Sequence, residues 1–230
     1  GLRARVKETL LEFLEVVCRK LLGVLSLRAR RRTAREADLL LLDSLDKEEP
    51  EYGVAAARAL DGLQKKGYKT SVDVVSEEGD RYRKVILPCL KYTDYLIINE
   101  VELSKCVDRP MRDADGNILE DEIKKGACEL LDAGVRELVV IHYPEGGVAA
   151  SKGGEVLSAP SYSPAREQIV STVGAGDAFC AGSLYAIHEG YPLEKMLKFA
   201  SACARFNLFS TTSTGGAPSL ETINEFYLNK

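Results

Sequence analysis

The chain has 230 residues and a formal net charge of −4, with 45% hydrophobic and 29% charged residues, as in ordinary globular proteins. No apolar run approaches the roughly 20 residues of a membrane span, and the start of the chain lacks a signal-peptide pattern. Six cysteines without a CxxC pair and only two histidines argue against a metal cluster, a disulfide framework and a Ser-His-Asp centre. We therefore expect a cytoplasmic protein with buried, reduced thiols and no membrane contact.

Residues 1–37 differ in charge from the rest of the chain. Apolar residues recur at helical spacing over 6–27, and the arginine-rich stretch 28–35 follows. Residues 1–35 have a net charge of +7 and the remainder has −11. Such a basic arm occurs in proteins that bind nucleic acid or membranes, but it is equally typical of a solvated helix face, which we favour. We expect a basic amphipathic helical segment ahead of a separate domain over 38–230, and no nucleic-acid partner.

From residue 38 onward, short apolar runs alternate with amphipathic segments. The expected strands are 38–45, 68–75, 94–99 and 136–143, with a hairpin of 147–151 and 154–160, and the expected helices are 50–65, 79–90, 118–132, 177–189, 192–209 and 219–228. Asp46 and Glu49 have capping-box spacing, Gly67 is a helix stop signal, and Gly153-Gly154 marks the hairpin turn. This alternation predicts an α/β fold whose mostly parallel sheet has helices on both faces and binds ligands beyond its carboxyl-terminal strand ends.

The stretch VGAGD, residues 173–177, places a bare turn directly before a helix. Backbone N–H groups at a helix start are unpaired, and the helix dipole favours negative charge there. Gly174, Ala175 and Gly176 lack bulk that would keep a ligand from these groups, so they predict an anion hole, most often for phosphate. Asp177 has two interpretations: a base that takes a proton from an attacking hydroxyl, or an acid that the dipole favours. No Walker loop occurs, and the turn does not complete GxGxxG.

The longer stretch STVGAGDAFCAG, residues 171–182, resembles the DTxGAGDxFxxG signature of the ribokinase-like, or PfkB, carbohydrate kinase family. The matching residues are Thr172, Gly174, Ala175, Gly176, Asp177, Phe179 and Gly182. The resemblance implies that Asp177 is the catalytic base and that the GAG turn is the anion hole for transfer of the γ-phosphoryl of ATP to a hydroxymethyl group of a sugar or sugar-like molecule. Ser171 replaces the leading Asp of the signature, beside which the family often builds a monovalent-cation site, so this cation is a further candidate cofactor.

Two further regions resemble the family. The NxxE motif at Asn99 and Glu102 follows an expected strand and implies residues that place the Mg²⁺ of the nucleotide, usually through water, as suits this ion. The stretch HYPEGG, residues 142–147, stands where the family has a TxGxxG-like nucleotide turn; Gly147 matches, whereas His142 and Pro144 replace Thr and the first Gly.

The last part of the chain supplies the other nucleotide residues that the resemblance implies. Ala202, Phe206 and Gly216 would flank the adenine, and Thr172 would join Gly147 in the nucleotide site; the residues alone leave simple packing as the alternative for the first three. DADGN, residues 113–117, lacks the spacing of a calcium loop and is expected to be a turn.

The resemblance covers about 38–224, the later two-thirds of a family member. It implies a three-layer ribokinase-like fold whose amino-terminal part and lid are incomplete, because 1–37 lack the glycine pair that holds the sugar. We expect ATP and a small sugar or nucleoside-like substrate as partners, with a homo-oligomer as a candidate assembly. The alternative is a catalytically impaired form of the fold that acts as a nucleotide-binding or protein-interaction module.

Overall fold

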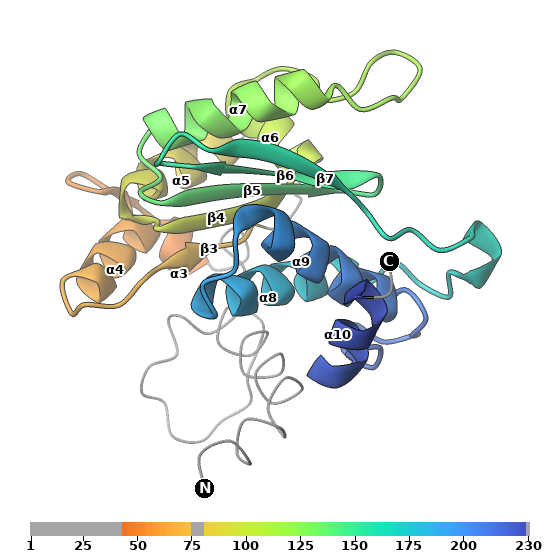
Figure 1. Ribbon diagram of the computed structural model, residues 1–230. Coiled ribbons are helices and arrows are strands. Elements are labelled where there is room, and N and C mark those ends of the chain that lie inside the picture. The colour runs from red at the N-terminus through yellow and green to blue at the C-terminus, as the bar shows by residue number, and fades with distance from the viewer. Residues whose placement is uncertain (1–42, 75–80, 229–230) are drawn as a thin grey trace, which may run out of the picture. The chain divides into compact units, whose positions relative to one another are not determined.

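The computed structural model describes residues 43–74 and 81–228 (Figure 1). Their contacts divide the chain into two compact units. The described residues of the sheet unit are 43–74, 81–143 and 148–157, and those of the helical unit are 144–147 and 158–228. The expected basic helix and the first part of the expected strand 38–45 lie outside the described residues.

Three parallel strands form one side of the five-stranded sheet: β3 (Ser71–Val72), β4 (Tyr95–Asn99) and β5 (Leu138–Tyr143). Leu96 to Ile98 and Val139 to Ile141 are fully buried, as expected for parallel strands that are covered on both faces. The five-stranded order continues through β6 (Gly146–Ser151) and β7 (Val156–Pro160), which form the expected hairpin.

Helices α6 (Glu100–Val107) and α7 (Glu120–Asp132) lie on one face of β4 and β5 (Figure 1). They meet closely, because a Cβ added to Gly126 would lie 3.1 Å from a Leu103 methyl carbon. Helix α7 agrees with the expected segment 118–132, whereas α6 is a helix that the sequence analysis did not predict.

The first described elements correct two predictions. Residues 43–46 form the short helix α3 (Asp43–Asp46) rather than strand, and the next helix, α4 (Ala55–Gln64), begins well after the expected capping box at Asp46 and Glu49. The residues between them form the antiparallel pair β1 (Glu48–Glu49) and β2 (Gly53–Val54). This pairing and the bond from Ala55 N to Lys47 O, 2.9 Å, occupy the backbone that a helix from residue 50 would need. Helix α4 ends ahead of Gly67, whose φ of 83° confirms the expected stop.

Helix α5 (Tyr82–Cys89) and the 3₁₀ turn η1 (Leu90–Tyr92) follow in the sheet unit, close to the expected helix 79–90. In the helical unit, η2 (Arg166–Gln168) precedes α8 (Ala175–His188), α9 (Leu193–Asn207) and α10 (Leu220–Leu228). These last three helices confirm the predicted segments to within about two residues at either end. Helices α8 and α9 pack at Gly182, where an added Cβ would lie 2.9 Å from the Ala200 Cα.

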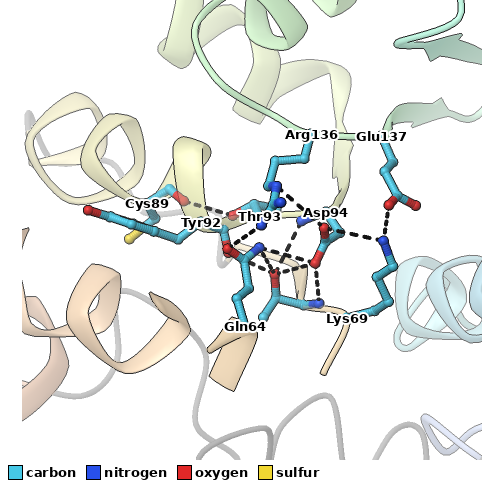
Figure 2. A network of polar contacts seen from close by, with 9 residues as sticks. Gln64, Lys69, Cys89, Tyr92, Thr93, Asp94, Arg136 and Glu137 are labelled. Atoms are coloured by element: carbon cyan, nitrogen blue, oxygen red, sulfur yellow. Dashed lines mark hydrogen bonds and ion pairs between the residues drawn. The ribbon is translucent and has the colours of Figure 1, made fainter. Parts of the chain in front are cut away.

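A polar network fixes the amino ends of the parallel strands (Figure 2). Asp94, which precedes β4, is 2% exposed, and its Oδ2 accepts from Thr70 N at 2.8 Å and from Gln64 Nε2 at 3.1 Å. Its backbone oxygen accepts from Glu137 N and Leu138 N, both at 3.1 Å, at the start of β5. One residue therefore sets the starting points of three strands, and with them the register that aligns their carboxyl ends.

Other sequence expectations concern thiols and membrane spans. All five cysteines in the described part of the chain are free, and Cys89, Cys106, Cys180 and Cys203 are buried. Burial raises the pKa of the Cys89 and Cys106 thiols to about 12, so both remain protonated at neutral pH. Among the described helices, none combines the length and the apolar character needed to span a membrane.

Candidate functional site

Asn99 and Glu102 hold each other in place at the carboxyl end of β4. The Asn99 Oδ1 accepts from Glu102 N and the Glu102 Oε2 accepts from Asn99 N, both at 2.9 Å. This reciprocal pair is a capping box, and it starts helix α6. The NxxE motif thus has a structural function that the sequence analysis did not predict, and the box fixes both side chains at the sheet edge where ligands bind in such folds.

The side chains around this capping box are paired with one another. Glu100 is 8% exposed and forms an ion pair with Arg112 at 2.8 Å. Arg112 also donates to Gly116 O at 2.9 Å, in the turn that the sequence analysis expected for residues 113–117. The Asp113 carboxylate accepts from the side chain and backbone of Asn117, and these bonds lower the pKa of Asp113. The turn is therefore confirmed, and hydrogen bonds among its own residues hold it.

The donor set suits a hydrated cation better than a directly bound one. Among the described residues, no group of three or more His, Cys, Asp or Glu side chains could hold a metal ion. Asn99 and Glu102 offer one amide and one carboxylate whose orientation is already fixed. Mg²⁺ keeps several of its waters in proteins, so two such groups fit it through bound water.

His142 lies beside Asn99, because the two residues are register partners on β5 and β4. Burial lowers the pKa of His142 to about 4, so its imidazole is neutral at pH 7. The residue that replaces Thr in the nucleotide-turn resemblance is therefore an uncharged group at the carboxyl edge of the sheet.

The GAG turn in the helical unit requires its first glycine. Gly174 has φ 78° and ψ 2°, in the left-handed region, and a Cβ at this position would lie 2.4 Å from the Ser213 O. Ala178 N donates to Gly174 O at 2.9 Å, which closes the first turn of α8. The Gly176 amide comes before the first N–H that has an acceptor within the helix, so it is placed to meet a negative ligand.

Asp177 is exposed in the first turn of α8. Helix α8 begins at Ala175, as the motif predicts, so the carboxylate follows the turn amides directly. This position fits both interpretations of Asp177, the catalytic base and the acid that the helix dipole favours. The role of base stays a prediction.

Two side chains hold the segment before the turn: that of Asn207, which the sequence analysis missed, and that of Ser171, which it named only as a replacement in the family signature. Asn207, 1% exposed at the end of α9, donates from Nδ2 to Val173 O at 2.9 Å. The Ser171 hydroxyl oxygen accepts from Val173 N at 3.1 Å. One signal was available for Asn207: it continues the buried positions Phe199 and Cys203 at steps of four, so it is a polar residue on an apolar helix face.

The other residues implied for the nucleotide site divide into exposed and packed positions. Thr172 is exposed, whereas Gly147 is buried in β6 and Ala202 is fully buried in α9. Phe206 is half-buried and meets Phe226 edge to face, with ring centroids 5.5 Å apart. A Cβ on Gly216 would lie 2.6 Å from the Phe206 O, so the structure brings Gly216 against α9. Ala202 can contribute through packing alone.

Comparisons with known proteins place the chain in a family. A profile described as pfkB family carbohydrate kinase matches residues 23–222. The 5-dehydro-2-deoxygluconokinase of Geobacillus thermodenitrificans is 31% identical over 103 residues, which cover 45% of this chain and 30% of that protein. The Bacillus subtilis protein of the same name is 36% identical over 90 residues, covering 39% and 27%.

Solved structures support the same fold. Arabidopsis thaliana ribokinase, in complex with ribose and ATP, has a TM-score of 0.60 at 23% identity and is matched over 74% of this chain and 50% of its own. A putative ribokinase II from E. coli, in complex with ATP and Mg²⁺, has a TM-score of 0.62 at 20% identity, with 77% and 54% covered. These matches confirm the α/β ribokinase-like fold that the sequence predicted.

The extent of these matches differs between the two chains compared. This chain spans about a third of the curated relatives and about half of the solved structures. The family profile nevertheless matches most of its 230 residues, including both the NxxE and the GAGD motifs. The chain belongs to the pfkB family of carbohydrate kinases.

Proposed function

We propose that the chain transfers the γ-phosphoryl group of ATP to a hydroxymethyl group of a sugar or sugar-like molecule. The observation that carries this proposal is the start of α8, where Gly174 turns in the left-handed region against Ser213 and Asp177 follows on the first helical turn. A turn of this shape presents backbone N–H groups to a phosphate, and a carboxylate beside it has a function if a hydroxyl must lose its proton there.

The chemistry assigns one step to each part of the motif. Asp177 takes the proton of the acceptor hydroxyl while the oxygen of that hydroxyl forms a bond to the γ-phosphorus. The bond between the γ-phosphorus and the β-γ bridging oxygen breaks, and ADP is released. The amides of Gly174 and Gly176 stabilise the negative charge on the transferred group, whereas the Ala175 amide donates to Thr172 O at 3.2 Å and helps to hold the turn. The proton ends on Asp177 and the phosphoryl group on the acceptor, so the step is balanced.

Asn99 and Glu102 are the residues that would hold Mg²⁺ through its water. When bound, the ion neutralises part of the charge on the nucleotide phosphates. A monovalent cation fits less well beside Ser171, because a hydroxyl replaces the carboxylate of the family signature and that hydroxyl already accepts from Val173 N. We therefore include ATP and Mg²⁺ in the proposal and leave the monovalent cation out.

The names of the relatives suggest which acceptor molecules to test first. Several are 5-dehydro-2-deoxygluconokinases, and one structural neighbour is a 2-dehydro-3-deoxygluconokinase. We propose a sugar acid of this kind as the first acceptor to test, with ribose as the neutral comparison.

The test is a coupled ADP-release assay of the chain with Mg-ATP and each acceptor. Asp177→Asn is expected to lower kcat by at least about 10²-fold, because general-base catalysis contributes about that much, while the affinity for Mg-ATP in a thermal-shift titration changes little. Undiminished turnover by the Asn variant would show that Asp177 is not the base and only favours the helix start.

The replaced nucleotide turn, with His142 and Pro144, favours a second candidate, a nucleotide-binding or protein-interaction module without transfer activity. Stabilisation by Mg-ATP without turnover on any acceptor would support this second function over the first.

A further inference from the structure

Val173, the residue that precedes the GAG turn, makes a side-chain hydrogen bond with each of its backbone polar groups. Val173 N donates to the Ser171 hydroxyl oxygen at 3.1 Å, and Val173 O accepts from Asn207 Nδ2 at 2.9 Å. The Val173 side chain is 63% exposed, so it contributes little packing of its own. The position of the Val173 backbone therefore depends on these hydrogen bonds.

The Asn207 side chain is held in one position by its surroundings. It is 1% exposed at the last position of α9, on the same buried face as Phe199 and Cys203. A buried amide is costly unless it is hydrogen-bonded, and its packing restricts the side chain to few conformations. The adjacent Leu208 O accepts from Val170 N at 2.9 Å, so the end of α9 contacts the segment 170–173 at two places.

A shift of Val173 would displace the amides of the predicted anion hole. Gly174 is the next residue, and it packs against Ser213 so closely that no Cβ could be added. The turn therefore has little room to absorb a displaced neighbour, and the first amides of α8 would move with it. Electrostatic stabilisation of a transition state requires donors that are already in place, and a misplacement of about 1 Å can cost about 10²-fold in rate.

We propose that Asn207 is a positioning residue that keeps the GAG turn preorganised for the transferred phosphoryl group. This inference rests on the proposed function of the turn. It assigns the rigidity of the anion hole to a side-chain amide from α9 rather than to a bound ion beside Ser171. Loss of that amide should then reduce kcat more than it weakens the binding of ATP, because the turn amides matter most when the charge moves.

The test compares Asn207→Leu with Asn207→Asp and with a matched control. Leu keeps the buried bulk without the donor, and Asp keeps the shape but places an acceptor against the Val173 carbonyl. The control is Ser201→Ala: Ser201 lies on the same helix, is 7% exposed, and loses only the bond that its hydroxyl oxygen accepts from Tyr162 N at 2.9 Å. We expect kcat to fall about 10- to 100-fold in both Asn207 variants, with the KM for ATP within about threefold of wild type, and to stay unchanged in the control.

A second measurement does not depend on activity. In ¹⁵N spectra of the full chain, Asn207→Leu should shift the amide signals of Gly174, Gly176 and Asp177, whereas Ser201→Ala should leave them in place. Equal loss of kcat in Asn207→Leu and Ser201→Ala, or unmoved turn amides in Asn207→Leu, would overturn the proposal. If the wild type transfers phosphate to no acceptor, the proposed function fails, and the amide signals alone decide whether Asn207 positions the turn.

Discussion

Gly174 shows how much of the site depends on a residue without a side chain. Its φ of 78° is unfavourable for other residues, and the Ser213 O occupies the space that a Cβ would need, at 2.4 Å. These are separate constraints, one on the backbone conformation and one on the space beside it. The sequence analysis explained Gly174 by the need for an anion hole without side chains. The contact with Ser213 could not be predicted, because the two residues lie far apart in the chain.

The two constraints can be separated by comparing two glycines. We expect Gly174→Ala to lower the free energy of unfolding by about 2–4 kcal/mol, because it combines backbone strain of about 1 kcal/mol with overpacking of about 1–3 kcal/mol. Gly190 is the control, since its φ is 68° and nothing lies within 4 Å of an added Cβ. Gly190→Ala should cost only the strain term. Urea unfolding curves measure both, and equal midpoints for the two variants would show that the turn relaxes away from Ser213.

At the scale of elements, the polar network at the amino ends of the strands joins several parts of the sheet unit. Asp94 is buried and accepts from Thr70 N, the Thr70 hydroxyl and Gln64 Nε2, at 2.8, 3.1 and 3.1 Å. Lys69 Nζ and Arg136 Nε lie 3.7 and 3.8 Å from its other oxygen. These partners come from the starts of β3 and β5 and from the end of α4.

Removal of this carboxylate should therefore loosen several elements at once. We expect Asp94→Ala to lower the free energy of unfolding by about 3–5 kcal/mol, because it leaves several donors at a buried site without their shared acceptor. Glu137→Ala is the matched control at the rim of the same network: its side chain is 40% exposed and its ion pair with Lys69 is a surface contact, so its loss should cost at most about 1 kcal/mol. A similar loss of stability in both variants, measured by urea unfolding, would contradict the central position of Asp94.

Elements that local sequence determines were predicted, whereas features that depend on residues distant in the chain were missed. Strand β4 and helices α7 to α10 were predicted, because long apolar periodicity and a local turn determine them. Helix α6 was missed because NxxE was interpreted only as a magnesium motif, although the same spacing with Asn first is also that of a capping box. The pair β1 and β2 was missed because two-residue strands carry no periodicity, and Asn207 because its partner, Val173, lies 34 positions away in the chain.

At the scale of the whole molecule, the two parts of the chain have net charges of opposite sign. Residues 1–35 have a net charge of +7, and the remaining residues have −11, within a total of −4. The acidic part contains both motifs of the proposed kinase site. A polyanion such as DNA would be attracted by residues 1–35 and repelled by the rest, and salt at physiological concentration screens both effects beyond about 8 Å.

This charge balance predicts the outcome of a nucleic-acid binding experiment. We expect the full chain to leave a 30-base-pair duplex unretarded in a gel-shift assay at about 150 mM salt, because the arginines of residues 28–35 are too few to offset an acidic body and a specific reader would need base contacts as well. A variant with these arginines replaced by glutamine should behave identically. A retarded complex that weakens steeply between 50 and 200 mM salt, and that the glutamine variant fails to form, would instead assign phosphate binding to this segment, because release of counterions from the duplex produces that salt dependence.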